Sequence, residues 1–264
     1  MAEKAYTFLD AGEWAHPFGV GPWHFEGETL TIFVESDPAS LQPYFPSPIE
    51  PSGAPIFRLT VHALRSDCGM GHEWAARNPR RSQFHEAVVA FNAEIDGVEG
   101  NWDPFMWTEA EPQLCVGREM YGFSMRLGEI ALTRRPALRG WRKGEIVTAE
   151  CSQDGRLAFA VTMTLDRTGS EAAPPPIQPN PVFYTRRTLP RPENPTISDV
   201  AIYRTAMLGL QAGEVWSGEG TFAIGHDNLR PLAGGKVVGA RWSTFEMTKG
   251  PAEIIERSLA RKKG

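Results

Sequence analysis

Short runs of alternating apolar and polar residues recur along most of this chain. Clusters of Gly, Pro, Asn and Asp separate these runs, as the connections between antiparallel strands require. Successive side chains of a strand point to opposite faces, so each run predicts a strand with one buried face. The predicted strands cover residues 29–35, 56–64, 86–95, 113–121, 146–151, 156–165, 197–205, 214–224 and 236–247. The pattern therefore predicts a mainly β protein.

Helical patterns are few. Residues 37–45 follow Ser36, a residue type favoured at helix N-termini, and they end before Pro46. Residues 251–262 place apolar side chains on one helical face and predict an amphipathic C-terminal helix. We therefore expect only a few short helices beside the strands.

The Pro-rich segment 170–181 decides how many domains to expect. Its composition fits either a linker between domains or a stiff loop inside one domain. Too few predicted strands follow it to form an independent sheet. We therefore expect a loop, and a single domain over residues 1–264.

Charge and composition exclude several kinds of partner. The net charge of −5 and the pI near 5.8 argue against binding to nucleic acid or anionic membranes. No apolar run reaches the roughly 20 residues of a membrane span, and the N-terminus lacks a signal pattern. Three widely spaced cysteines (Cys68, Cys115 and Cys151) suit a reducing cytoplasm and offer no metal-binding spacing. Without a dinucleotide, P-loop or metalloprotease motif, the sequence predicts a cytoplasmic protein with no cofactor.

The segment 117–128 reads Gly-Arg-Glu-Met-Tyr-Gly-Phe-Ser-Met-Arg-Leu-Gly. It resembles the segment that carries the catalytic lysine in acetoacetate decarboxylases, roughly Gly-Arg-Glu, a short spacer and Pro-Lys-Lys. In that family the first lysine forms a Schiff base with the substrate, and the second depresses its pKa. The resemblance places Ser124, Met125 and Arg126 at the Pro-Lys-Lys positions. A thioether cannot form an imine, so this position cannot carry out Schiff-base decarboxylation.

The resemblance extends over about the whole chain. Further segments that resemble the family lie at residues 21–25, 36–48, 99–102, 109–112, 214–218 and 226–232. The resemblance implies the family's fold, a cone-shaped antiparallel β-barrel that encloses a pocket. It also implies assembly into a homo-oligomer.

Another lysine would have to supply a substitute amine. The chain has six lysines: Lys4, Lys143, Lys236, Lys249, Lys262 and Lys263. A catalytic lysine needs a desolvated pocket that lowers its pKa. Four of the six lie near the termini, and none has a sequence context that predicts such a pocket, although Lys236 comes closest.

The polar pocket residues of the family are also replaced. By the resemblance, Glu28 occupies the place of the family's arginine and Thr60 that of its first glutamate. The second glutamate falls near Ala75, with Glu73 two positions away. Because the whole polar set has changed, the sequence favours a task different from acetoacetate decarboxylation.

Four residues are candidates for catalysis. Arg126 takes the place of the family's second lysine and would bind a carboxylate or oxyanion, unless it is an ordinary surface arginine. His62 shares a strand face with Thr60, and the resemblance turns that face into the pocket. His72 and Glu73 follow a Gly-rich turn and would act together as an acid–base group, unless they belong to a polar surface loop.

Five residues are candidates for contact with substrate. They are Thr60, Trp23, Tyr121, Met125 and Trp102. The alternative for the aromatic residues is packing in the core. Two functions remain open. One is a cofactor-independent lyase, dehydratase or isomerase that acts by acid–base chemistry on a small hydroxy or keto compound, anionic or aromatic. The other is a non-catalytic pseudoenzyme of the same fold that serves in ligand binding or assembly. The cation at Arg126 and the histidines favour the enzyme.

Overall fold

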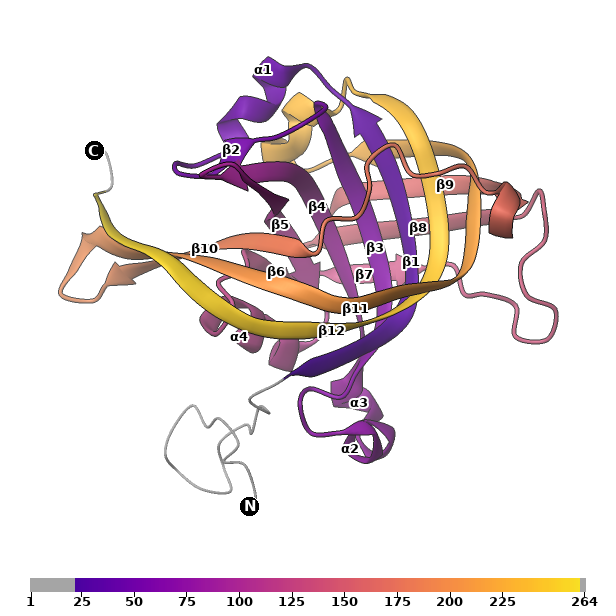
Figure 1. Cartoon of the computed structure of the whole chain (residues 1–264), viewed down its shortest axis with the longest axis horizontal. Helices are drawn as coiled ribbons and strands as arrows, with labels where there is room; N and C mark the ends of the chain where they lie inside the picture. The colour runs from indigo at the N-terminus through magenta and orange to yellow at the C-terminus, as the bar shows by residue number, and fades with distance from the viewer. Residues whose placement is uncertain (1–21, 262–264) are drawn as a thin grey trace.

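A computed structural model of the chain describes residues 22–261, and twelve strands in it form one sheet. Figure 1 shows how these strands wrap around the middle of the molecule. The strands are β1 (Trp23–Glu35), β2 (Glu50–Pro51), β3 (Ile56–Ser66), β4 (Gln83–Ile95), β5 (Val98–Thr108), β6 (Met125–Leu127), β7 (Glu129–Leu132), β8 (Ile146–Gln153), β9 (Arg156–Thr168), β10 (Val182–Arg191), β11 (Asn194–Ile224) and β12 (Lys236–Arg261).

The sheet closes on itself through β10. Its path runs β10-β5-β4-β3-β1-β12-β11, and β11 pairs again with β10. The result is a closed ring of strands, from which β9, β8 and β7 continue beyond β11. The pairs are antiparallel except β10 with β5 and β6 with β5. This arrangement confirms the predicted mainly β fold with a few short helices.

Short helical segments connect the strands. They are α1 (Pro38–Leu41), η2 (Gln42–Tyr44), α2 (His72–Arg77), α3 (Pro79–Ser82), α4 (Glu111–Glu119), η3 (Gly169–Glu171) and η4 (Asp227–Leu232). The first two lie within the predicted helix at 37–45, although Asp37 rather than Ser36 is the N-cap residue. In the described part of the chain, no helix is long and apolar enough to cross a membrane.

The strand predicted over residues 113–121 is wrong, because α4 occupies most of it. Pro112 lies in the first turn, where a proline loses no helical hydrogen bond, and Glu111 lies there too. The helix buries Gln113, Val116 and Gly117. These buried positions have the spacing of one helical face. The sequence prediction interpreted the same residues as the alternating pattern of a strand.

The C-terminal helix predicted over residues 251–262 is also wrong. The described residues there continue β12, which starts at Lys236 and pairs with β11 from Ala240 to Arg261. Pairing along a neighbouring strand overrides a local helical pattern of this kind. The predicted strands 197–205 and 214–224 likewise join into β11, whose register shifts several times against β12. Strands β5 and β10 lie where no strand was predicted.

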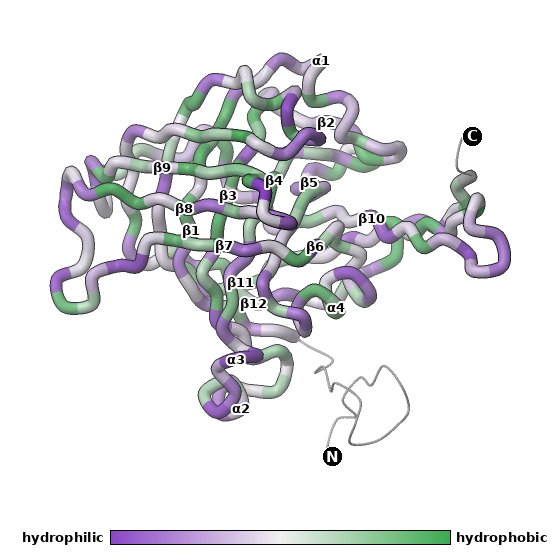
Figure 2. The backbone as a smooth tube through the Cα atoms, turned by 180° about the vertical axis from the view of Figure 1, so that it is seen from behind, coloured by the Kyte–Doolittle hydropathy of each residue, from purple (hydrophilic) through white to green (hydrophobic). Residues whose placement is uncertain are grey.

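Two apolar clusters lie on opposite faces of the ring's strands. On β1 and β3, Leu30, Ile32, Leu59 and Val61 belong to the larger cluster. The residues that alternate with them face the other way, toward the interior of the ring. Figure 2 shows hydrophobic and hydrophilic residues alternating along the strands. The smaller cluster includes Trp23, Val88, Met106, Tyr121, Phe123 and Met125.

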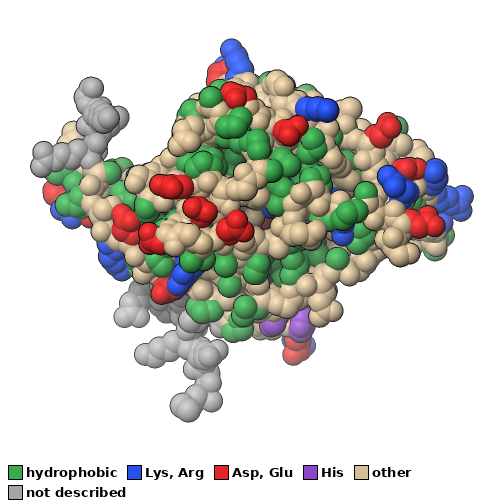
Figure 3. Space-filling view, turned by 45° about the horizontal axis from the view of Figure 1, so that its top comes forward, with side chains coloured by type: hydrophobic (Ala, Val, Ile, Leu, Met, Phe, Trp, Pro, Cys, Tyr) green, Lys and Arg blue, Asp and Glu red, His purple; other side chains and the backbone are tan. Residues whose placement is uncertain are grey.

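Apolar side chains also reach the surface. Figure 3 shows many of them across the middle of one face of the molecule. Large exposed apolar residues on β10, β11 and β12 include Leu189, Leu208, Leu210, Ile254 and Leu259. These three strands extend together beyond the ring, as Figure 1 shows.

Candidate active site

A cavity of about 290 Å³ lies inside the ring. One face of each of β1, β3, β4, β5 and β12 contributes to its wall, together with α4 and the residues around Met125. From β3 the wall receives Arg58, Thr60 and His62, which alternate with the buried apolar residues of that strand. The Pro-rich segment contributes Pro175, Ile177, Pro179 and Asn180. The cavity is thus a small chamber with a largely apolar wall.

Five charged residues line this cavity, three basic and two acidic. They are Arg58, Arg241, Lys249, Glu86 and Asp103. The bases come from β3 and β12, whereas the acids come from β4 and β5. Burial raises the pKa of both acids, which favours their neutral forms. The cavity therefore carries an excess of positive charge at neutral pH.

Lys249 lines the cavity, and only 9% of its surface is exposed. Its Nζ lies 4.1 Å from the ring centroids of both Tyr121 and Phe123. Trp23 is its partner in the register of β1 and β12. Burial lowers the pKa of Lys249, while Glu86 and Asp103 act in the opposite direction. None of the ion pairs in the described part of the chain involves Lys249.

The two acids differ in their surroundings. Burial raises the pKa of Asp103 to about 6, although Arg58 and Lys249 favour its charged form. Its Oδ1 is buried and has no hydrogen-bond partner in the part of the chain that the structure describes. Burial is also the largest cause that raises the pKa of Glu86. Both carboxyl groups are therefore suited to hold a proton nearer neutral pH than an exposed carboxyl group does.

Arg58 joins the charged groups to the Pro-rich segment. Its Nη2 donates to the Asn101 Oδ1 at 2.7 Å, and the Asn101 amide donates to the Asn180 carbonyl at 2.7 Å. The Arg58 Nε is buried, and none of residues 22–261 forms a hydrogen bond with it. A guanidinium remains charged even where burial lowers its pKa, as it does here. Arg58 is thus held in place and retains a donor for an anionic ligand.

His62 also faces the cavity, directly across from Glu86 in the register of β3 and β4. Its ring packs edge-on against Phe245, with centroids 5.6 Å apart. Burial lowers the pKa of His62 to about 4. Its Nδ1 is buried, with no hydrogen-bond partner in the described region. The imidazole is therefore neutral at pH 7 and a weaker base than an exposed histidine.

The structure brings several of the predicted site residues into this one cavity. Thr60, His62, Trp23 and Met125 all line it. Thr60 is hydrogen-bonded to Thr31 across the strands, at 3.1 Å between the hydroxyl oxygens. Tyr121 lies behind the wall, where its ring contacts Trp23 and the Lys249 amine.

Arg126 is directed away from the cavity, contrary to the sequence prediction. Met125 lines the cavity, and the next residue of a strand points to the opposite face. The Arg126 guanidinium stacks over Phe105 and Trp107, at 5.3 and 5.9 Å from their centroids. Burial lowers its pKa, with Arg118 as a further cause.

Three other predicted residues also lie outside the cavity. His72 and Glu73 are exposed on α2, where Glu73 forms an ion pair with Arg77 at 2.6 Å. His72 stacks on His24 instead, with ring centroids 5.9 Å apart. The predicted acid–base pair is thus separated from the cavity. Trp102 is in the larger apolar cluster, and its Nε1 donates to the Tyr44 carbonyl at 2.8 Å.

The residues predicted for the site include none of the five charged residues that line the cavity. A signal for Lys249 is present, since Phe245, Met247 and Lys249 continue one face of β12 into the cavity. The predicted strand stopped at residue 247, so Lys249 was not assigned to it. The other described lysines differ, because Lys236 is exposed and Lys143 pairs with Asp166. Lys4, Lys262 and Lys263 lie outside the described residues.

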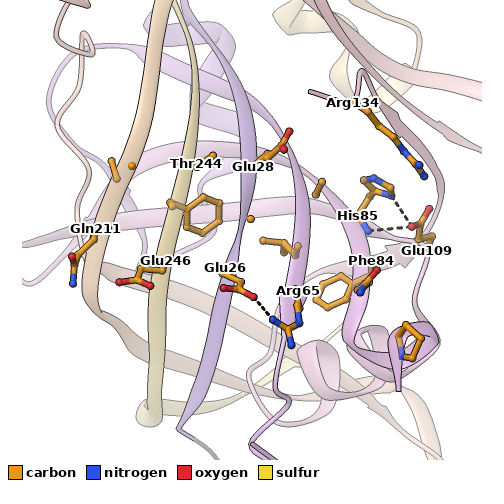
Figure 4. A pocket seen from close by; sticks show the side chains of 18 of the residues that line it. Glu26, Glu28, Arg65, Phe84, His85, Glu109, Arg134, Gln211, Thr244 and Glu246 are labelled. Atoms are coloured by element: carbon orange, nitrogen blue, oxygen red, sulfur yellow. Dashed lines mark hydrogen bonds and ion pairs between the residues drawn. The ribbon is translucent and has the colours of Figure 1, made fainter. Parts of the chain in front are cut away.

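A second pocket lies beside β1, β3 and β12 and is more open to solvent. Figure 4 shows its ion pairs, one between Glu26 and Arg65 and one between His85 and Glu109. Their side chains are partly exposed, so solvent screens these charges. The enclosed cavity is the better candidate site. Within residues 22–261 no group of three His, Cys, Asp or Glu residues is placed to hold a metal ion.

The protein thus encloses a small, positively charged cavity within a closed ring of strands. Residues 7–259 match the family model described as acetoacetate decarboxylase (ADC). The chain therefore belongs to the acetoacetate decarboxylase family.

Three similar proteins illustrate the relationship. An acetoacetate decarboxylase of Clostridium acetobutylicum is 27% identical over 112 residues, which is 42% of this chain and 41% of that protein. The structure of an acetoacetate decarboxylase-like enzyme from Sphingomonas wittichii RW1 superposes with a TM-score of 0.82 at 21% identity, covering 89% of this chain and 93% of the other. The enduracididine biosynthesis enzyme MppR, complexed with pyruvate, has a TM-score of 0.82 at 20% identity, covering 96% and 97%. At these identities the structural matches show a shared fold.

Proposed function

We propose that this protein is a cofactor-independent enzyme of the lyase, dehydratase or isomerase class that acts on a small oxo or hydroxy acid. The observation that carries the proposal is the set of three bases and two acids around one enclosed cavity. An excess of buried positive charge favours an anionic ligand. A volume of about 290 Å³ fits a compound of a few carbon atoms.

Arg58 is the proposed carboxylate-binding residue. It retains its charge, and its Nε has no hydrogen-bond partner among the described residues. A carboxylate that accepts a hydrogen bond from this group would satisfy it. The MppR structure holds pyruvate, which is a carboxylate of this size, in a protein of the same fold.

Glu86 is the proposed proton-transfer group. Its raised pKa lies closer to neutrality than that of an exposed glutamate, as a general acid–base residue requires. His62, across from it, is neutral at pH 7 and would hydrogen-bond the substrate or the carboxyl group. The acid–base role predicted for His62 is thus shared with Glu86 in this proposal. His72 and Glu73 take no part in it.

Turnover assays on the purified protein test the function. We would follow acetoacetate, small hydroxy acids, and pyruvate with an aromatic aldehyde by proton NMR. A substrate should be consumed, and Glu86→Gln should lower the rate by about 10²–10⁴-fold. The matched control is Glu246→Gln, an exposed glutamate on β12, which should keep the full rate. If these compounds bind but none reacts, the protein is a ligand-binding pseudoenzyme instead.

We also propose that the protein assembles into a homo-oligomer in the cytoplasm. Leu189, Ile254 and Leu259 are exposed on the parts of β10 and β12 that extend beyond the ring. Contact between copies would remove this apolar surface from water. Light scattering after gel filtration should give a mass above the 29.2 kDa of one chain. A mass equal to one chain at micromolar concentration would contradict the assembly.

A further inference from the structure

The amine of Lys249 lies beside the same chain segment that contains Met125. Lys249 is on β12, yet its Nζ is 4.1 Å from the ring centroid of Phe123, two residues before Met125. Lys249 and Met125 both line the cavity. A buried amine is therefore present near the position where the sequence has a thioether in place of a lysine.

The surroundings of Lys249 are those of a nucleophilic amine rather than of a structural ion pair. The faces of Tyr121 and Phe123 cover its Nζ, and ion pairs with carboxylates are lacking among the described residues. Burial outweighs the attraction of Glu86 and Asp103, so the pKa of Lys249 falls below its ordinary value. A larger share of the amine is then neutral at pH 7, and only the neutral amine attacks a carbonyl.

The cavity also provides the partners that such an attack requires. Arg58 and Arg241 supply positive charge for a carboxylate elsewhere in the cavity. Glu86 and Asp103 interact electrostatically with Lys249, and both hold a proton more readily than exposed acids do. An oxo acid bound through its carboxylate would thus have its carbonyl group in a chamber with an amine and two proton donors.

We propose that the Lys249 Nζ is the catalytic nucleophile of this protein and forms an imine with the carbonyl carbon of a small oxo acid. The inference rests on the proposed function and adds to it a covalent intermediate on a residue of β12. Lys249 would thus supply the amine that Met125 lacks.

The step balances with groups of the cavity and water alone. The Nζ lone pair forms a bond to the carbonyl carbon, the C=O π electrons move to oxygen, and that oxygen takes a proton from a carboxyl group. The nitrogen then returns a proton to the resulting carboxylate. The carboxyl group passes this proton to the new hydroxyl, which leaves as water, and the nitrogen lone pair closes the C=N bond. In its protonated form the imine accepts electrons from a neighbouring carbon–carbon or carbon–hydrogen bond. Addition of water releases the product and restores the amine.

Trapping with borohydride tests the inference. The full-length protein is incubated with pyruvate or acetoacetate and then reduced, and intact mass and peptide mapping locate any adduct. Reduction of the imine should add the mass of the oxo acid less one oxygen atom, on Lys249. Lys249→Met should remove the adduct, and Lys249→Arg serves as a second variant that keeps a positive charge in the cavity. The matched control is Lys236→Met, an exposed lysine at the start of β12, which should keep the adduct.

The outcomes separate this inference from the proposed function. Turnover without any trapped adduct would overturn the imine and leave the acid–base enzyme intact. An adduct on another lysine, or one that persists in Lys249→Met, would overturn the assignment of the nucleophile. Absence of both an adduct and turnover would overturn the inference and the proposed enzyme together. Thermal melting of each variant shows whether it is folded.

Discussion

The Nζ of Lys249 lies 4.1 Å from the ring centroid of Phe123, so β12 delivers an amine to the segment that carries Met125. The register of β12 against β1 fixes this position, with Lys249 opposite Trp23. Closure of the ring is what brings the C-terminal strand next to the segment after α4. A residue that is distant in the sequence thereby contributes to the same site.

Met125 and Gly117 are packed so closely that a larger residue at Gly117 has no room. A Cβ on this glycine would overlap the Met125 Sδ. Gly117→Ala should therefore lower the free energy of unfolding by about 1–3 kcal/mol, even though alanine favours helix by about 1 kcal/mol. Urea denaturation measures the change.

A double-mutant cycle shows whether Met125 causes that loss. Gly117→Ala combined with Met125→Ala should lower the free energy of unfolding by less than the sum of the two single changes. The shorter alanine at position 125 leaves room for the Cβ at position 117. If the two changes are additive, the two residues do not interact in the way the structure indicates.

His62 should make the protein sensitive to acid. Burial lowers its pKa in the folded state to about 4, whereas the pKa in the unfolded chain is near 6.5. Between these values the unfolded state binds more protons, so stability is full above pH 6.5 and falls as the pH drops toward 4. Between pH 7 and pH 5, the free energy of unfolding of His62→Leu should therefore rise by up to about 2 kcal/mol relative to that of the natural protein.

Urea denaturation at the two pH values measures this gain. The variant removes only the imidazole, so the titration of Glu86 and Asp103 is common to both proteins and largely cancels. His85→Leu is the matched control, because His85 is partly exposed and pairs with Glu109. An equal loss of stability in His62→Leu and the natural protein between pH 7 and pH 5 would contradict the buried, neutral imidazole.

The Pro-rich segment should behave as a loop within one domain. After it, β10 pairs with β5 and β12 pairs with β1, so strands from both sides of residues 170–181 complete the ring. Limited proteolysis in this segment should leave two fragments that elute together on gel filtration. Separation into two independently folded fragments would instead identify the segment as a linker between domains.

Much of the ring was predictable from the sequence, because alternation of side chains along a strand is a local property. Residues 56–64 were predicted as a strand with His62 on its polar face, and β3 has that face toward the cavity. The C-terminal region was not predictable in the same way. There the pairing of β12 with β11, a long-range contact, prevails over a local helical pattern.

The site was predictable only in part for the same reason. Thr60 and His62 could be placed from their strand alone, whereas Lys249 reaches the cavity only because the ring closes around it. Arg126 was misplaced because the prediction treated two adjacent strand residues as sharing one pocket. Successive side chains of a strand point to opposite faces, so Met125 and Arg126 cannot both line the cavity.

The cavity should bind a small anionic oxo acid through Arg58, and calorimetric titration with pyruvate measures this binding. Arg58→Met removes a charge-assisted contact worth about 2 kcal/mol and should weaken binding about 30-fold. Arg126→Met is the matched control, because this arginine stacks on Phe105 and Trp107 outside the cavity, and it should leave the affinity unchanged. Undiminished affinity for pyruvate in Arg58→Met would contradict the binding of the oxo acid through Arg58, above all if Arg126→Met lost binding instead.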